Sequence, residues 1–262
     1  MGTVGKAISL LELFSADVPE LGLSELSRLS GFDKATTRRL LVSLSGRGFV
    51  EQDATTRRYR LGPELSRLAR VREAHYPFLR IAVPLIRALA QETGETAHIS
   101  EYSAAGLATV HVEESTRANR VGVKIGLLLP LHGTASGIAF LAHARPDIAK
   151  ARLERKLDAF TSFTVTERDR LVESIQAASL RGYSFGDQGY EEGVFSVGAA
   201  VLGPDGYAIG ALAVASPVSR IDEAVAAAHG RAAAGTAREI SRRLFGEPVP
   251  SARARPSQGE AP

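Results

Sequence analysis

The sequence of 262 residues contains no cysteine. This absence excludes disulfide bonds, thiolate metal sites and a cysteine nucleophile. The sequence also lacks an apolar run of about 18 residues, the length that a membrane-spanning helix needs. Glu12 and Asp17 fall where a secretory signal peptide requires an apolar core. With 44% hydrophobic and 23% charged residues, as in ordinary globular proteins, the chain is expected to be cytoplasmic and to have no membrane partner.

Motifs for bound metals, nucleotides and cofactors are missing as well. The six histidines include no HExxH sequence and none of the close spacings that are typical of metal ligands. No Walker A sequence occurs, and the glycines between residues 22 and 48 do not form a dinucleotide fingerprint. We therefore expect neither a metal nor a cofactor.

Basic charge is concentrated near the N-terminus. The net charge of +3 lies in residues 1–76, which carry 12 Lys and Arg against 9 Asp and Glu, whereas residues 77–262 carry 20 of each. Within residues 28–60 the count is 8 basic against 3 acidic residues. Such a segment is typical of a phosphate-binding module, and a solvated charged surface is the alternative interpretation.

The first 62 residues have the pattern of a winged helix-turn-helix domain. Residues 5–16 predict a helix, because apolar residues recur at three-residue intervals. Ser24 is placed to cap a short second helix, and Asp33 to cap a third helix that runs from Lys34 to about Arg47. Two extended stretches, 49–52 and 57–61, predict a β-hairpin after these helices.

The third helix is predicted to bind DNA. Thr37, Leu40, Leu41 and Leu44 gather on one side of the helical wheel and are expected to pack on the earlier helices. The opposite side mixes hydrogen-bond donors, small apolar groups and arginines, which suits base edges and phosphates. The candidate DNA-binding residues, with two from the hairpin, are Lys34, Ala35, Thr36, Arg38, Arg39, Ser43, Arg57 and Arg58.

The basic hairpin is predicted to be a wing beside the DNA backbone. Strand alternation would put Arg57 and Tyr59 on one face and Arg58 and Arg60 on the other, so at most half of the cluster could face DNA. Arg58 or Arg60 could then serve a domain interface. Since two-fold symmetric dimers read two half-sites, we expect a palindromic operator in double-stranded DNA.

After residue 62 the chain changes character. A helix over residues 63–76 is expected to link two domains and, through Leu65, Leu68 and Val71, to take part in self-association. Residues 77–246 predict an α+β domain in which antiparallel hairpins over 96–113 and 201–215 alternate with helices. The predicted helices are 78–92, about 133–143, 167–181 with Thr166 as cap, and 219–244. Residues 247–262 hold too little apolar material to pack and are expected to be disordered.

Short motifs in both parts resemble the IclR (isocitrate lyase regulator) family of bacterial transcription regulators. In the first part the matching segments are residues 6–11, 23–26, 36–41 and 48–50. In the second part they are PLHGTASG at 130–137, EEGV at 191–194, the alanines at 199–200 and SPVSR at 216–220. Each motif is short, but their order and spacing over residues 5–246 resemble this family specifically.

The resemblance implies a winged helix-turn-helix, a linker helix and a GAF-like domain with an antiparallel sheet. That domain would bind a small, usually carboxylate-bearing metabolite, in a homodimer or a dimer of dimers. Backbone amides at the start of the helix after residues 130–131 could receive an anionic group. The implied effector pocket is lined by Val121, Ala135, Ser136, Val194, Ser196, Ala213 and Ala215, with Asp187 as a further candidate.

A few positions depart from the family pattern. Ile138 stands where a lysine is usual, and Gly186 stands where some members carry a pocket aspartate. Ala213 and Ala215 replace serines that occur in some members. These less polar walls favour a larger or partly apolar ligand, such as an aromatic acid.

Two other functions are weighed against an effector-controlled regulator. The second domain could have lost its ligand and serve assembly alone. Alternatively, GYSFG at 182–186 fits the G-x-S-x-G pattern of a serine hydrolase, with Asp205 or Asp222 and then His229 in the right order. That nucleophile needs a turn from strand into helix, whereas Gly182 follows a predicted helix as its C-terminal cap. We therefore expect no catalytic residues.

Overall fold

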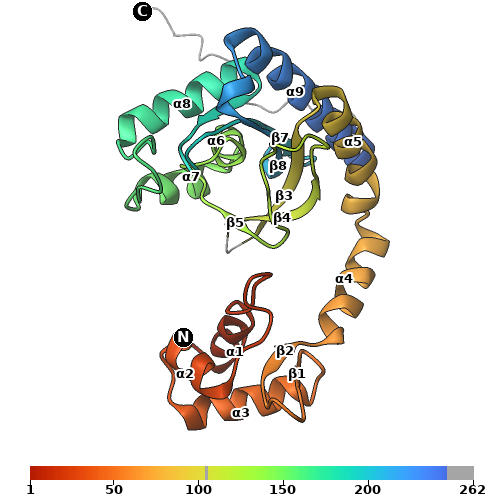
Figure 1. Cartoon of the computed structure of the whole chain (residues 1–262), viewed down its shortest axis with the longest axis vertical. Coiled ribbons are helices and arrows are strands. Elements are labelled where there is room, and N and C mark those ends of the chain that lie inside the picture. The colour runs from red at the N-terminus through yellow and green to blue at the C-terminus, as the bar shows by residue number, and fades with distance from the viewer. Residues whose placement is uncertain (104–105, 247–262) are drawn as a thin grey trace, which may run out of the picture. The chain divides into compact units, whose positions relative to one another are not determined.

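A computed structural model describes residues 1–103 and 106–246, so the segment 247–262 that was predicted to be disordered lies outside the described residues. The chain divides into two compact units, one over Met1–Pro77 and one that begins at Phe78. Figure 1 shows the elements of each unit. No helix among the described residues is both long enough and apolar enough to cross a bilayer.

The first unit has the element order that the sequence predicts, three helices followed by a hairpin and a fourth helix. Its helices are α1 (Thr3–Leu11), α2 (Leu23–Ser30), α3 (Lys34–Ser45) and α4 (Pro63–His75), and its antiparallel strands are β1 (Val50–Gln52) and β2 (Tyr59–Leu61). The first helix ends at Leu11 and not near residue 16. Phe14 is nevertheless buried in the loop that follows, which explains the longer apolar pattern.

Apolar side chains from all of these elements except α4 form the core of the first unit. The core consists of Leu10, Phe14, Leu21, Leu26, Leu40, Leu41, Val50 and Tyr59. Asp33 caps α3 as predicted, since its Oδ1 atom accepts a hydrogen bond from the Thr36 amide at 2.8 Å. The prediction of Ser24 as the cap of α2 is wrong. The N-cap is Gly22, whose amide donates to the Glu25 carboxylate at 2.7 Å.

The second unit is an α+β domain built on a six-stranded antiparallel sheet. Its strand order is β5-β4-β3-β8-β7-β6. The strands are β3 (Thr96–Ser103), β4 (Gly106–Glu113), β5 (Leu128–Leu129), β6 (Ser184–Asp187), β7 (Val194–Leu202) and β8 (Ala208–Pro217). The helices are α5 (Phe78–Thr93), α6 (Ala135–Ala142), α7 (Pro146–Leu153), α8 (Arg168–Arg181) and α9 (Glu223–Phe245), with a 3-10 turn at Val218–Arg220.

Helices cover both faces of this sheet. α5 and α9 pack together on one face, while α6 packs on the other face against β7 and β8, with α8 behind it (Figure 1). The predicted hairpins β3–β4 and β7–β8 are confirmed. Strand β7 begins at Val194 and not at residue 201, because its mostly apolar sequence lacks the polar alternation by which a half-exposed strand is found.

Several boundaries in the second unit differ from prediction. Strands β5 and β6 and helix α7 were not predicted, since each is short and holds few apolar residues in a regular pattern. The N-cap of α8 is Glu167 and not Thr166. Asp222 caps α9 by accepting from the Val225 amide at 2.8 Å, so that helix begins after the 3-10 turn.

Candidate functional site

Helix α3 presents an exposed, positively charged face. Thr37, Leu40 and Leu41 are buried and Leu44 is partly buried, which confirms the predicted packing side. On the opposite side Arg38, Arg39 and Ser43 are exposed, and so are Lys34 and Ala35, while Thr36 is partly buried. Val42, between the arginines and Ser43, is 62% exposed. An apolar group held in water beside two guanidinium groups suits contact with thymine methyl groups and phosphates.

The hairpin arginines lie in three different environments. The prediction that Arg57 shares a strand face with Tyr59 is wrong, because Arg57 lies in the turn before β2 with a φ of 59° and is exposed, whereas Tyr59 is buried. Arg58 donates to the Glu20 carbonyl at 2.9 Å and pairs with Glu25 at 3.0 Å. Arg60 pairs with Glu51 across the hairpin at 3.1 Å. Arg58 and Arg60 therefore have partners inside their own unit.

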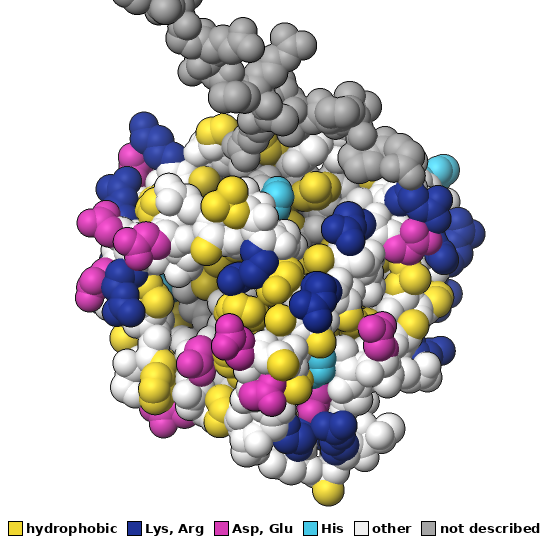
Figure 2. Space-filling model, turned by 90° about the horizontal axis from the view of Figure 1, so that it is seen from above, with side chains coloured by type: hydrophobic (Ala, Val, Ile, Leu, Met, Phe, Trp, Pro, Cys, Tyr) yellow, Lys and Arg dark blue, Asp and Glu magenta, His cyan; other side chains and the backbone are white. Residues whose placement is uncertain are grey.

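The charge on α3 is of one sign, whereas another face of the molecule carries charges of both signs. The face in Figure 2 carries acidic and basic side chains interspersed with one another. No acidic residue occurs in α3 after its cap at Asp33. The α3 face therefore keeps an uncompensated positive potential, which attracts a polyanion.

The second unit encloses a cavity between the sheet and the start of α6. Seven of the implied effector residues line it, namely Val121, Ala135, Ser136, Val194, Ser196, Ala213 and Ala215. The lining also includes residues that sequence reasoning missed, namely His98, Gly122, Val123, Leu127, Leu129, Gly133, Thr134, Gly189, Tyr190 and Glu191. The volume is about 70 Å³, whereas an apolar protein cavity that binds benzene has about 150 Å³. The space therefore suits a ligand that is more compact than an aromatic ring.

Strand register explains which side chains reach the cavity. His98, Ala213 and Gly198 are paired in one row across β3, β8 and β7, and Ala215 and Ser196 are paired in the next row. Residues paired in this way share a face of the sheet. Asp187, the remaining candidate, does not line the cavity and is exposed, because its neighbour Gly186 takes the cavity side of β6.

Glycines let α6 approach the sheet closely. A Cβ atom on Gly186 would lie 2.8 Å from Ser196 Oγ and 2.9 Å from the Ala135 amide nitrogen. A Cβ atom on Gly198 would lie 2.6 Å from the Ala135 carbonyl group. There is therefore no room for an aspartate at position 186, and the first turn of α6 forms a wall of the cavity.

The first turn of α6 supplies the positive end of a helix to this cavity. Thr134 caps the helix, because its hydroxyl accepts from the Gly137 amide at 3.0 Å and donates to the Pro130 carbonyl at 2.9 Å. The amides of Ala135 and Ser136 belong to the first turn, where amides have no partner within the helix. Two lining residues thus carry donors suited to an anionic group.

His98 is the buried titratable group of the cavity. The residue is 5% exposed, and burial lowers its pKa to about 4, so the ring is neutral at pH 7. Its Nε2 atom lies 3.3 Å from Ser136 Oγ, and its Nδ1 atom has no hydrogen-bond partner among the described residues. The strand pattern contained a signal for it. Thr96, His98 and Ser100 are three polar residues at alternate positions of a strand that is otherwise apolar at its start.

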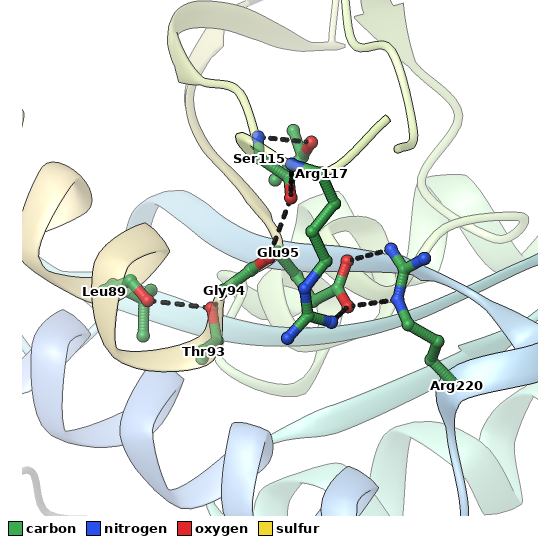
Figure 3. Close-up of polar contacts among 8 residues, drawn as sticks. Leu89, Thr93, Gly94, Glu95, Ser115, Arg117 and Arg220 are labelled. Carbon is green, nitrogen blue, oxygen red and sulfur yellow. Dashed lines mark hydrogen bonds and ion pairs between the residues drawn. The ribbon is translucent and has the colours of Figure 1, made fainter. Parts of the chain in front are cut away.

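A polar network fixes the loop that brings Val121 to the cavity. Figure 3 shows Glu95 between the guanidinium groups of Arg117 and Arg220. Arg220 makes two hydrogen bonds of 2.7 Å to this carboxylate and Arg117 makes one of 2.7 Å. The Glu95 side chain is only 2% exposed. Both arginines are therefore paired with a carboxylate that has almost no contact with water.

Hydroxyl groups complete the attachment of this loop. Ser115 Oγ donates to the Gly94 carbonyl at 2.7 Å, as Figure 3 shows. The Thr96 hydroxyl accepts from the Ser115 amide at 3.1 Å and donates to the Val121 carbonyl at 2.7 Å. The loop is thus held to the start of β3 at both of its ends, and the position of Val121 follows from that attachment.

The surroundings of Ser184 do not suit a hydrolase nucleophile. Gly182 ends α8 with a φ of 84°, and the chain then enters β6, so the order is helix to strand as predicted. Ser184 is fully buried, and its hydroxyl donates to the Ala135 carbonyl at 2.6 Å. Within the described ranges, no group of three or more His, Asp or Glu residues is arranged to hold a metal ion.

Comparison with protein families gives two matches. Residues 3–54 match the family described as "IclR helix-turn-helix domain". Residues 74–242 match the family described as "Bacterial transcriptional regulator IclR C-terminal". These two segments include both the exposed face of α3 and the cavity.

Individual proteins are similar over most of the chain. A glycerol operon regulatory protein of Streptomyces coelicolor is 31% identical over 216 residues, which are 82% of this chain and 85% of that protein. The crystal structure of a putative IclR transcriptional regulator from Silicibacter sp. TM1040 has a TM-score of 0.89 and 38% identity, covering 95% of this chain and 98% of that one.

A further solved structure contains a bound ligand. It is an IclR homologue from Microbacterium hydrocarbonoxydans in complex with 4-hydroxybenzoate, with a TM-score of 0.78 and 21% identity. The match covers 92% of this chain and 100% of that one. At this identity the likeness concerns the fold.

Proposed function

The chain belongs to the IclR family of DNA-binding transcription regulators, and from this premise we propose that a small monocarboxylate bound in the cavity controls its affinity for a palindromic operator. Operator binding would take place in the cytoplasm. The observation that carries the regulatory part is the cavity itself, which joins helix-end amides to mostly apolar walls. A ligand there changes DNA affinity if it binds the DNA-competent and incompetent forms with different strength.

The exposed face of α3 supports the DNA-binding part of the proposal. Arg38 and Arg39 are the long donors of this face, and Arg57 is exposed in the turn of the hairpin. We propose that Arg39 reads a base edge and that Arg57 contacts phosphate. Arg58 is the weaker of the proposed phosphate contacts, since its guanidinium group already pairs with Glu25.

Substitution of Arg39 tests the recognition helix. Operator fragments are first selected from random duplex DNA by the wild-type protein. Arg39→Ala should then weaken binding by about 1–3 kcal/mol and relax the sequence preference. Arg170→Ala, which removes an exposed arginine from α8 in the other unit, is the matched control and should leave anisotropy titrations unchanged. Equal affinities for wild type and Arg39→Ala would contradict the assignment.

The charge and size of the cavity support a compact monoanion as effector. The helix-end amides favour one negative group. Glu191, an exposed lining residue, disfavours a second one. The bound 4-hydroxybenzoate of the Microbacterium homologue is also a monocarboxylate. The volume of about 70 Å³ favours an acid smaller than the aromatic one expected from the less polar wall residues.

Substitution of Ala213 tests the effector site. A thermal-shift screen of small carboxylates is followed by operator titration with each hit. Ala213→Glu should remove the stabilisation, because an unpaired carboxylate would occupy the cavity. Operator binding without a ligand should persist. If no acid stabilises the wild type, or if a hit stabilises Ala213→Glu equally, the cavity is not the effector site and the second unit serves assembly alone.

The exposed apolar face of α4 supports self-association. Leu68 and Val71 are exposed on this helix and Leu65 is partly buried. We propose a homodimer or a dimer of dimers in which this face takes part. Light scattering should give at least twice the chain mass of 27.8 kDa, and the double substitution Leu68→Glu, Val71→Glu should lower it. A wild-type monomer at micromolar concentration would contradict the proposal.

A further inference from the structure

The tip of the β1–β2 hairpin holds an arginine in a backbone conformation that L-residues avoid. Arg57 has a φ of 59°, in the left-handed region, where a Cβ atom crowds the backbone and glycine has none. In the described ranges, Gln188 is the only other residue besides glycines with a positive φ. Because such strain tends to persist where a side chain has a use, the Arg57 side chain is a candidate for function.

Gln52, the last residue of β1, and Asp53, the next residue, hold the tip in this form. Gln52 Nε2 donates to the Arg57 carbonyl at 2.9 Å, and the Arg57 amide donates to the Asp53 carbonyl at 3.0 Å. Asp53 Oδ1 accepts from the amides of Thr55 and Thr56 at 2.9 and 2.7 Å and from the Thr56 hydroxyl at 3.0 Å. Hydrogen bonds therefore fix both backbone groups of Arg57 and the turn that leads to it.

The side chain of Arg57, in contrast to its backbone, is free. It is exposed, and its guanidinium group makes no hydrogen bond or ion pair with any residue that the structure describes. Arg58 and Arg60 of the same hairpin are each paired with a glutamate. Residues 54–56 of the turn carry no charge. The tip thus combines a fixed backbone with an uncompensated cation.

We propose that Gln52 is a positioning residue for DNA binding, which holds the backbone of Arg57 so that the guanidinium group meets a phosphate without further ordering of the hairpin. This inference rests on the proposed function, because it concerns the phosphate contact assigned to Arg57. A binding group whose backbone is ordered before its partner arrives loses less conformational entropy on binding. The hydrogen bond from Gln52 therefore contributes to DNA affinity although it is made within the protein.

A double-mutant cycle tests whether Gln52 acts through Arg57. Gln52→Met keeps the length of the side chain and removes its donor. In the wild-type background it should weaken binding of the selected operator by about twofold to tenfold, the range of a single hydrogen bond. In an Arg57→Ala background it should change the affinity by less than about twofold, since the group that it positions is absent. Gln176→Met on α8 is the matched control, since it changes an exposed glutamine of the other unit, and it should leave the affinity unchanged.

Glycine at position 57 tests the strain. Arg57→Gly and Arg57→Ala remove the same guanidinium group, so both should weaken DNA binding to the same extent in anisotropy titrations. Arg57→Gly should unfold a few degrees above Arg57→Ala in scanning calorimetry of the full-length protein, because glycine takes a φ of 59° without a clash. If the two variants unfold at the same temperature, the conformation of Arg57 is not strained and the proposal is overturned.

The outcomes distinguish this inference from the proposed function. If Arg57→Ala weakens DNA binding but Gln52→Met has no effect, or has the same effect in both backgrounds, the role of Gln52 is overturned and the phosphate contact stands. Gln52→Ala, which also removes the donor, repeats the cycle if Gln52→Met does not fold. If Arg57→Ala leaves the affinity unchanged, the proposed phosphate contact fails, and the role of Gln52 fails with it.

Discussion

Glu25 and Glu95 show how differently the two units use charge. Glu25 of the first unit is 43% exposed and pairs with an arginine that is 40% exposed. Glu95 of the second unit is 2% exposed and receives two arginines. Exposed pairs contribute little to stability and leave the surface field available to a polyanion. In a buried pair both charges have lost their hydration, so removal of one partner leaves the other charge without compensation and is strongly destabilising.

Removal of Arg220 should have the largest effect. Arg220→Leu leaves the buried Glu95 carboxylate with Arg117 as its remaining arginine, so the free energy of unfolding of the second unit should fall by up to about 3–5 kcal/mol, the upper limit set by a fully unpaired buried charge. Arg145→Leu is the matched control, since it removes an exposed arginine that pairs with Asp205 in the same unit. It should cost at most about 1 kcal/mol. Chemical denaturation followed by circular dichroism measures both. Equal losses of stability for the two variants would contradict the difference between the buried pair and the exposed pair.

Acid should destabilise the second unit over a defined pH range. The pKa of His98 is about 4 in the folded protein and about 6.5 in an unfolded chain. Between these values the unfolded chain binds a proton that the folded one does not, so stability falls as the pH drops from about 6.5 to 4, by up to about 3 kcal/mol. Burial also lowers the pKa of His132 and His229, which adds to the loss.

A series of denaturation curves between pH 4 and pH 8 measures this loss. His98→Asn removes the titrating group and should flatten the dependence on pH, with the part due to His132 and His229 left. If the variant and the wild type lose stability in parallel, His98 is not the group responsible.

The smallest effect is expected within the basic hairpin. Arg57→Ala should weaken binding to all DNA sequences alike and reduce the slope of log K against log salt by about one. Arg58→Ala should reduce the slope by less, because Glu25 and the Glu20 carbonyl already engage its guanidinium group. Anisotropy titrations at several salt concentrations distinguish the two. If Arg58→Ala reduces the salt slope more than Arg57→Ala does, then Arg58 and not Arg57 makes the stronger phosphate contact.

The same contrast explains how far the sequence alone could predict this protein. The cap at Asp33, the buried side of α3 and the β1–β2 hairpin depend on residues close together in the chain, and all three are confirmed. The basic charge of α3 could be predicted from the sequence without knowledge of any tertiary contact. DNA contacts at α3 and the hairpin stay predictions.

The cavity was harder to predict because residues from 98 to 215 meet there. The family motifs pointed to seven lining residues, but the register of β6 decides that Gly186 and not Asp187 faces the cavity. His98 carries no motif. The polar residues at alternate positions mark one face of β3, but the register of β3 against β8 decides that this face meets the cavity.

The glycines under α6 determine how this cavity can change in the course of evolution. Every substitution at Gly198 adds a Cβ atom that meets the Ala135 carbonyl group at 2.6 Å, so it must displace the helix. Gly186 is restricted in the same way by Ser196 and the Ala135 amide. The floor of the cavity is therefore closed to mutation unless α6 shifts as a whole. If the cavity is the effector site that we propose, a descendant of this protein can acquire a new ligand by changing wall residues such as Val121 or Val194, while the first turn of α6 is inherited unchanged.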